Sequence, residues 1–145
     1  MKLRLLAYIS IWLLVATACA SGGVATVDKP ASPNLVSPEG EEDEYELTII
    51  DPGFERWFAL HGRPVNYYTP THYEQRNKQY VIQWNSLVSQ RGSFGSADFP
   101  FENYIDYRMD TDYGLELNYE LYWYFRYIES LYGRRYGFGL GGRNS

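Results

Sequence analysis

The 145-residue sequence is poor in the side chains that form disulfides and zinc sites. Cys19 is the single cysteine, which excludes an intramolecular disulfide. The two histidines, His61 and His72, have neither a second cysteine nor an HExxH pattern beside them, whereas a zinc site needs several ligands at recognisable spacing. P-loop and nucleophile-elbow motifs are also lacking. We therefore expect no metal and no cofactor, and no motif indicates catalysis.

Basic residues are scarce as well. Thirteen Lys and Arg stand against eighteen Asp and Glu, which gives a formal net charge of −5. Proteins that bind nucleic acid need a clustered basic face to meet the phosphates, so we expect no nucleic-acid partner. Aromatic residues, by contrast, are abundant, with fifteen Tyr, four Trp and seven Phe. Each large ring buries about 150–250 Å², so these rings can build the core of a small domain.

The sequence lacks an apolar run long enough to cross a bilayer, which takes about 20 residues. Its most apolar stretch, residues 5–16, has twelve residues and follows the basic residues Lys2 and Arg4. Small residues then lead to Cys19. A charged start, a short apolar stretch and a small-residue cleavage site are typical of a secretory signal peptide. We predict a signal peptide over residues 1–18.

The residues before Cys19 resemble the bacterial lipobox, in which small residues precede a cysteine that is acylated and becomes the new N-terminus. Thr17 and Ala18 fit that pattern, and Ala16 stands where Leu is usual. The resemblance implies that Cys19 is the lipidation site and that the protein is attached to a membrane through it. Two or three acyl chains would anchor it durably, because one chain gives only marginal binding. The alternative is an ordinary secretory leader cleaved nearby, with Cys19 incidental.

Residues 19–44 lack aromatic side chains and hydrophobic periodicity, and they contain Pro30, Pro33 and Pro38. This composition predicts a disordered tether between the lipid anchor and the domain. Its acidic end, residues 39–44, is interpreted as solvated linker rather than as a binding segment.

A folded, aromatic-rich domain is predicted over residues 45–133. Residues 45–50 are typical of a strand. Asp51, as an N-cap before Pro52, then starts a helix that ends at Gly62. The apolar face of this helix is expected to comprise Phe54, Trp57, Phe58 and Leu60.

A second helix is predicted to begin at Thr71, which forms a capping box with Glu74. Glu74 and Lys78 make a favourable pair at i,i+4 on its polar side. Asn77 falls on the apolar face and is interpreted as a hydrogen-bonded core amide. The rest of that face is Tyr73, Tyr80, Trp84, Leu87 and Val88.

The last helix is predicted over residues 112–132 with Asp112 as N-cap. Acidic residues at Asp106, Asp110, Asp112 and Glu116 suggest a calcium loop, but the EF-hand spacing fails, and capping explains Asp112 better. Residues 134–145 are Gly-rich and predicted to be a flexible tail. The apolar stripe of the helix is Leu117, Leu121, Tyr124, Phe125, Ile128, Leu131 and Tyr132. We therefore predict an α+β fold: a small single domain dominated by three helices, with one or two short strands, preceded by the signal peptide and the tether.

Tyr119, Trp123 and Tyr127 recur at i, i+4 and i+8 of the last helix, off its main stripe and beside Arg126. If exposed, this row would stack on sugar rings or anchor a protein partner, for which Tyr, Trp and Arg are preferred. Alternatively, another helix or the first strand covers it. In so small a domain the covered alternative is favoured. The four residues are the candidate contacts for a partner or glycan.

Three segments resemble a family of small lipoproteins of unknown function from Bacteroidota: IIDPGFERWF (49–58), NYYTPTHYEQRNKQYVIQWN (66–85) and YIDYRMDTDYGLELNYELYWYF (104–125). The resemblance implies a lipobox leader followed by one compact domain, and it brings no activity or catalytic residue. In such bacteria an acidic run directly after the cysteine is associated with surface export. Cys19 is instead followed by Ala-Ser-Gly-Gly, which favours the outer membrane, facing the periplasm.

Taken together, these features favour a cell-envelope lipoprotein that is a non-enzymatic interaction or structural module, in contact with another envelope protein. A glycan-binding module that uses the row of rings is the first alternative. A small hydrolase is the second alternative.

Overall fold

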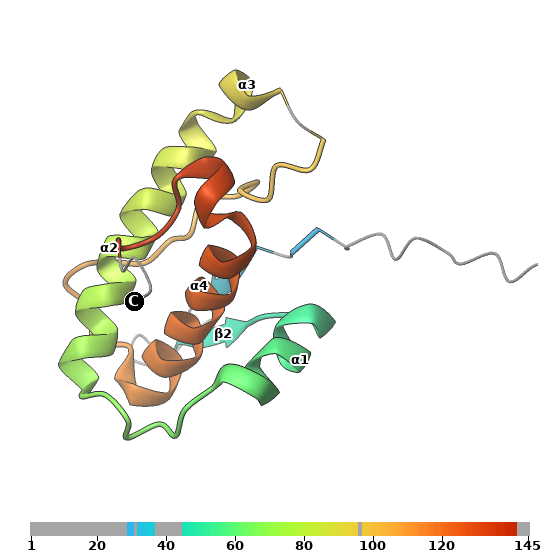
Figure 1. Cartoon of the computed structure of the whole chain (residues 1–145). Helices are drawn as coiled ribbons and strands as arrows, with labels where there is room; N and C mark the ends of the chain where they lie inside the picture. The colour runs from blue at the N-terminus through green and yellow to red at the C-terminus, as the bar shows by residue number, and fades with distance from the viewer. Residues whose placement is uncertain (1–28, 31, 37–44, 96, 142–145) are drawn as a thin grey trace, which may run out of the picture.

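The computed structural model describes residues 29–30, 32–36, 45–95 and 97–141. The predicted signal peptide, Cys19 and the acidic run 39–44 lie outside these residues. The described chain forms one small α+β domain, as predicted, with four helices and a two-stranded antiparallel sheet (Figure 1). The elements are β1 (Asn34–Val36), β2 (Glu46–Thr48), α1 (Pro52–His61), α2 (Pro70–Ser89), α3 (Arg91–Phe94) and α4 (Gly114–Tyr136).

Helix α1 starts and ends where the sequence predicts. The Asp51 carboxylate accepts hydrogen bonds from the backbone N–H groups of Gly53 and Phe54 at 2.8 and 3.1 Å, and Pro52 takes the first helical position. This arrangement satisfies two of the donors that a helix N-terminus leaves unpaired. Gly62 closes the helix by donating to the carbonyl of Phe58. Leu60, however, is 82% exposed, so its assignment to the apolar face is wrong.

Helices α2 and α4 lie side by side and form the centre of the domain (Figure 1). Helix α2 begins two residues earlier than predicted, because Pro70 occupies its first position and Thr69 is the N-cap. The Thr69 hydroxyl accepts from the backbone N–H of His72 at 3.2 Å. The predicted capping box at Thr71 is therefore wrong, while Glu74 does pair with Lys78 at i,i+4.

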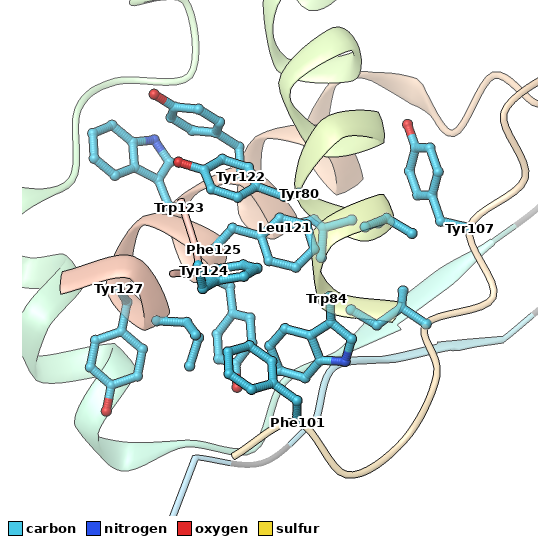
Figure 2. Packing of buried hydrophobic residues seen from close by; sticks show 14 of the residues in the cluster. Tyr80, Trp84, Phe101, Tyr107, Leu121, Tyr122, Trp123, Tyr124, Phe125 and Tyr127 are labelled. Carbon is cyan, nitrogen blue, oxygen red and sulfur yellow. The ribbon is translucent and has the colours of Figure 1, made fainter. Parts of the chain in front are cut away.

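The core between these helices consists mainly of aromatic rings (Figure 2). Trp84 of α2 is fully buried and meets Phe101 edge-on at 4.8 Å between ring centroids. Tyr80 stacks on Phe125 at 5.1 Å. Such offset and edge-to-face contacts each add about 0.5–1.5 kcal/mol beyond the area they bury. The high aromatic content therefore supplies the core of this small domain.

Asn77 is a hydrogen-bonded core amide, as predicted. Its side-chain N–H group donates to the backbone carbonyl of Asn118 at 2.8 Å and to the Asn118 side-chain oxygen at 3.0 Å. The hydroxyl of Tyr107 donates to the same Asn118 oxygen at 2.8 Å. A polar cluster that is buried and bonded in this way fixes the register of α2 against α4.

One strand of the sheet lies in the segment that composition predicts to be a disordered tether. Strand β1 pairs antiparallel with β2, with Leu35 opposite Leu47. Pro30 and Pro33 are buried, and Lys29 forms an ion pair with Glu102 at 2.5 Å. The prediction of a disordered tether is therefore wrong for the described residues between 29 and 36. Strand β2, predicted over residues 45–50, is confirmed in shorter form.

Helix α4 starts at Gly114, later than predicted, and its N-cap is Tyr113, so the prediction of Asp112 as N-cap is wrong. The Asp112 carboxylate instead accepts from the Gly114 N–H at 3.0 Å, just ahead of the helix. The helix continues through Gly133 to Tyr136, so the predicted end at residue 132 is too early. Leu131, assigned to the buried stripe, is 43% exposed.

The residues after α4 also belong to the domain, and the prediction of a flexible tail is wrong for residues 134–141. Phe138 is 1% exposed because its ring inserts between Tyr80, Trp84 and Phe101. The backbone N–H of Gly139 donates to the side chain of Gln83 at 2.8 Å. The tail is thus held across α2 by one buried ring and one hydrogen bond.

Candidate functional site: a pocket between helices α2 and α4

The row of rings on α4 is covered by α1. Trp123 and Tyr127 are only 8% and 6% exposed (labelled in Figure 2), and Trp57 of α1 packs against both at 6.2 and 5.8 Å. Tyr119 is half-buried, and its hydroxyl donates to the carbonyl of Arg63 at 2.6 Å. The favoured alternative, in which another helix covers this face, is what the structure shows. Trp123 and Tyr127 therefore do not form an exposed row with Tyr119.

Tyr119 instead lines an open groove between α1 and α4, with a volume of about 410 Å³. Phe54 and Phe58 share its apolar floor, and its carboxylates are Glu55, Glu116 and Glu120. Burial raises the pKa of Glu120 above its ordinary value. This groove is acidic, in keeping with the net charge of the chain.

Arg126, the remaining candidate, lies in a different place: a pocket of about 140 Å³ between α2 and α4, here called the α2–α4 pocket. Helix α2 contributes side chains at i, i+4 and i+8, and α4 contributes side chains at i, i+4 and i+7, so one face of each helix lines it. Its lining residues are Tyr68, His72, Arg76, Tyr80, Tyr122, Arg126, Glu129 and Leu140.

A chain of polar contacts crosses the inner side of the pocket. The Tyr80 hydroxyl donates to a carboxylate oxygen of Glu129 at 2.6 Å, and the Arg126 guanidinium lies 3.5 Å from the same oxygen. Burial and the bond to Glu129 raise the pKa of Tyr80 far above its usual range. Tyr80 is therefore a neutral donor at physiological pH, and Glu129 and Arg126 form an ion pair across one turn of α4.

The outer side of the pocket carries a second arginine and an aromatic pair. Within the part of the chain that the structure describes, no carboxylate forms an ion pair with Arg76. The His72 ring stacks on Tyr68 with centroids 4.2 Å apart. Burial, and then the charge of Arg76, lower the pKa of His72 below its ordinary value. With His72 neutral, two arginines and one glutamate leave the pocket with a formal charge of +1.

Comparison with protein families identifies the chain. The family model of a family of unknown function (DUF6146) matches residues 6–140. The chain belongs to this family. No curated protein and no solved structure matches it.

The DUF6146 match ends at Leu140, the last residue of the pocket lining, so the tail that walls the pocket lies inside the family region. Among residues 29–30, 32–36, 45–95 and 97–141, no group of His, Cys, Asp and Glu side chains could hold a metal ion. In the same residues, no helix has the length and hydropathy needed to cross a bilayer.

Of the pocket residues, only Arg126 is predicted from the sequence as a candidate contact. His72 stands out in the sequence only as a metal-ligand candidate and Tyr80 as a core residue, while Tyr68, Arg76 and Glu129 have no predicted role. The i, i+4, i+8 spacing of His72, Arg76 and Tyr80 can be read from the sequence of the second helix. The sequence does not reveal which face of the last helix packs against this one. The pocket is formed by that packing of α4 against α2.

Proposed function

We propose that this DUF6146 protein is a lipoprotein of the cell envelope, anchored through an acylated Cys19, and that its domain acts by binding another envelope component. The leader over residues 1–18 and the position of the single cysteine support the anchor. Residues Ala-Ser-Gly-Gly after Cys19, which contain no acidic side chain, favour the outer membrane and a domain that faces the periplasm.

The observation that carries the proposal is how soon after Cys19 the chain joins the domain. Lys29 pairs with Glu102, and Lys29 follows Cys19 by ten positions. Ten residues span at most about 33–36 Å when fully extended, at about 3.3–3.6 Å each. An acylated Cys19 would therefore keep the Lys29 side of the domain within that distance of the lipid. Such a placement suits a module that meets partners at the membrane surface.

The groups in the α2–α4 pocket support binding rather than proton transfer. Arginine stays charged at any physiological pH. Burial raises the pKa of Tyr122 to about 12 and that of Tyr80 beyond the usual range. A general acid or base works best when its pKa lies near the working pH, and these phenols and guanidinium groups do not titrate there. The arginine and tyrosine side chains of the pocket thus present fixed charge and neutral donors, which suit the binding of a ligand.

Substitution of the anchor residue tests the proposed attachment. In the native host, Cys19→Ala is expected to move the protein from the membrane fraction to the soluble fraction, while Ser21→Ala, two residues away, leaves it membrane-bound. Intact-mass analysis of the wild-type protein should show a chain that starts at Cys19 with fatty acids attached. Retention of Met1, or a trimmed terminus without fatty acid, would refute the anchor.

Photo-crosslinking in cells tests the proposed binding. A crosslinking residue at Gln75, next to Arg76, is expected to give a covalent adduct with an envelope component. The same residue at Ser86, exposed on α2 eleven positions further on, is expected to give none. Absence of an adduct at Gln75, or equal adducts at both positions, would contradict a binding role for this pocket.

A further inference from the structure

We propose that the α2–α4 pocket binds an anionic oxygen group, a carboxylate or a phosphate, on a ligand whose apolar part lies against Tyr68 and Leu140. This inference names the ligand class for the proposed binding role and rests on that role. The charge of the pocket is opposite in sign to that of the whole chain. The chain has a net charge of −5, yet this pocket has a formal charge of +1.

The two arginines have different surroundings, and the difference defines where the anion sits. Arg126 already faces Glu129, and Glu129 is itself held by the Tyr80 hydroxyl at 2.6 Å. Arg76 lines the same pocket, and none of the described carboxylates is paired with it. An incoming oxygen group would therefore complete the charge pairing of Arg76 and share the free donors of Arg126. Guanidinium groups bind carboxylate and phosphate with two parallel hydrogen bonds, which favours these groups over other anions.

Glu129 is fixed in place from a third side, which keeps the floor of the pocket rigid. The tail passes so close that a side chain at Gly139 would collide with the Glu129 carboxyl group. Gly139 also has a φ of 145°, a conformation that residues other than glycine rarely adopt. The tail therefore limits how far the Glu129 carboxylate can turn outward, and this carboxylate is the ion-pair partner of Arg126. A preformed site of this kind binds with less loss of side-chain freedom.

The walls of the pocket determine which part of the ligand can lie beside its anionic group. Tyr68 is stacked on His72, and Leu140 reaches in from the tail, so both offer half-buried apolar surface beside the charged groups. With about 140 Å³, the pocket admits one charged group and a small apolar or ring substituent. The groove between α1 and α4, ringed by Glu55, Glu116 and Glu120, has the opposite charge and should repel the same ligands.

The test is an NMR titration of the protein purified as the cell makes it, in non-ionic detergent, observed through the arginine Nε–H signals. Benzoate and phenyl phosphate are the probes, with benzyl alcohol and benzylamine as neutral and cationic counterparts of the same size. Both anions are expected to shift the Arg76 and Arg126 signals in a saturable manner. If benzoate binds more tightly than phenyl phosphate, the natural ligand group is a carboxylate, and if phenyl phosphate binds more tightly, it is a phosphate. The two counterparts should bind at least tenfold more weakly.

Arg76→Gln is the decisive variant, because Arg76 has no ion pair among the described residues whose loss would disturb the fold. It is expected to weaken anion binding about tenfold, as loss of a charge-assisted hydrogen bond does. The matched control, Arg56→Gln on the exposed side of α1, should stay within twofold of wild type. Arg126→Gln should weaken binding at least as much as Arg76→Gln does.

Three results would overturn the inference. They are an equal response to benzyl alcohol, an equal loss in Arg56→Gln, and the absence of any saturable arginine shift. None of them bears on the anchor, which the Cys19→Ala fractionation tests separately. A Gln75 crosslink without anion binding would leave a binding role at this pocket and refute only the ligand class.

Discussion

Asn77→Asp is the substitution that most directly probes how the core is held together. Asn77 is fully buried, and its N–H group donates to two oxygens of Asn118. The other side-chain atom, Asn77 Oδ1, is buried without a hydrogen-bond partner among the described residues. The carboxyl group of the introduced Asp has the same shape as the amide that it replaces. If ionised, it would face two acceptor oxygens with no donor to stabilise its charge, so we expect it to stay protonated in the fold.

The cost follows from linkage between protonation and folding. In the unfolded chain the introduced carboxyl has a pKa of about 3.9, and each pH unit above that costs about 1.4 kcal/mol if the fold keeps it protonated. At pH 7 this amounts to about 4 kcal/mol, and at pH 4.5 to less than about 1 kcal/mol. Because the folded-state pKa is raised, stability is present at low pH and is lost as the pH rises. A protonated carboxyl also donates one hydrogen bond to Asn118, which limits the loss at low pH.

The measurement is urea-induced unfolding followed by tryptophan fluorescence, at pH 4.5 and at pH 7, with wild type at each pH as the reference. Gln79→Glu, an exposed change of the same chemistry on the same helix, is the control and should change the free energy of unfolding by less than about 0.5 kcal/mol. A variant Asn77→Asp that is as stable as wild type at pH 7, or whose deficit does not grow with pH, would refute the buried two-bond geometry.

Two further predictions concern the tail and the tyrosines. Phe138→Ala should lower the free energy of unfolding by about 3–5 kcal/mol, because its ring is 1% exposed. Leu131→Ala, on the exposed surface of α4, is the control and should cost far less. Thermal unfolding of the two variants compares these losses, and equal losses would place the tail outside the core. Burial raises the pKa values of Tyr122 and Tyr127 to about 12, so the stability from these neutral phenols should be complete below about pH 10 and fall as pH rises toward 12. Phenolate absorbance during alkaline titration measures this, and full ionisation near pH 10 in the folded protein would contradict it.

Local chemistry made much of the fold predictable. Asp51 before Pro52 marks the start of α1, and the apolar face around Asn77 marks the buried side of α2, since both signals lie within one helix. The N-cap of α2 shows the limit of such signals. Thr69 and Thr71 are both candidate N-caps in the sequence, and the proline between them decides for Thr69, because its fixed φ suits the first helical position.

The features that sequence reasoning missed depend on partners far away in the chain. Strand β1 has three residues and follows prolines, so its composition resembles a linker, and it is a strand only because β2 offers a pairing edge. Phe138 lies in a glycine-rich stretch and is buried only because Trp84 and Phe101 leave room for its ring. Neither partner can be identified from local periodicity, which records one element at a time.

The same non-local contacts that were missed give the α2–α4 pocket its shape. The tail supplies Leu140 as a wall and holds Glu129 through the close approach of Gly139. If the tail were flexible, Glu129 could turn outward and Arg126 would follow it, and the pocket would lose its rigid floor. Burial of Phe138 therefore does two things: it completes the aromatic core, and it holds the neighbouring Gly139 against the Glu129 carboxyl group. Stability of the tail and anion binding should consequently decline together, and this coupling follows from the fold rather than from any single side chain in the pocket.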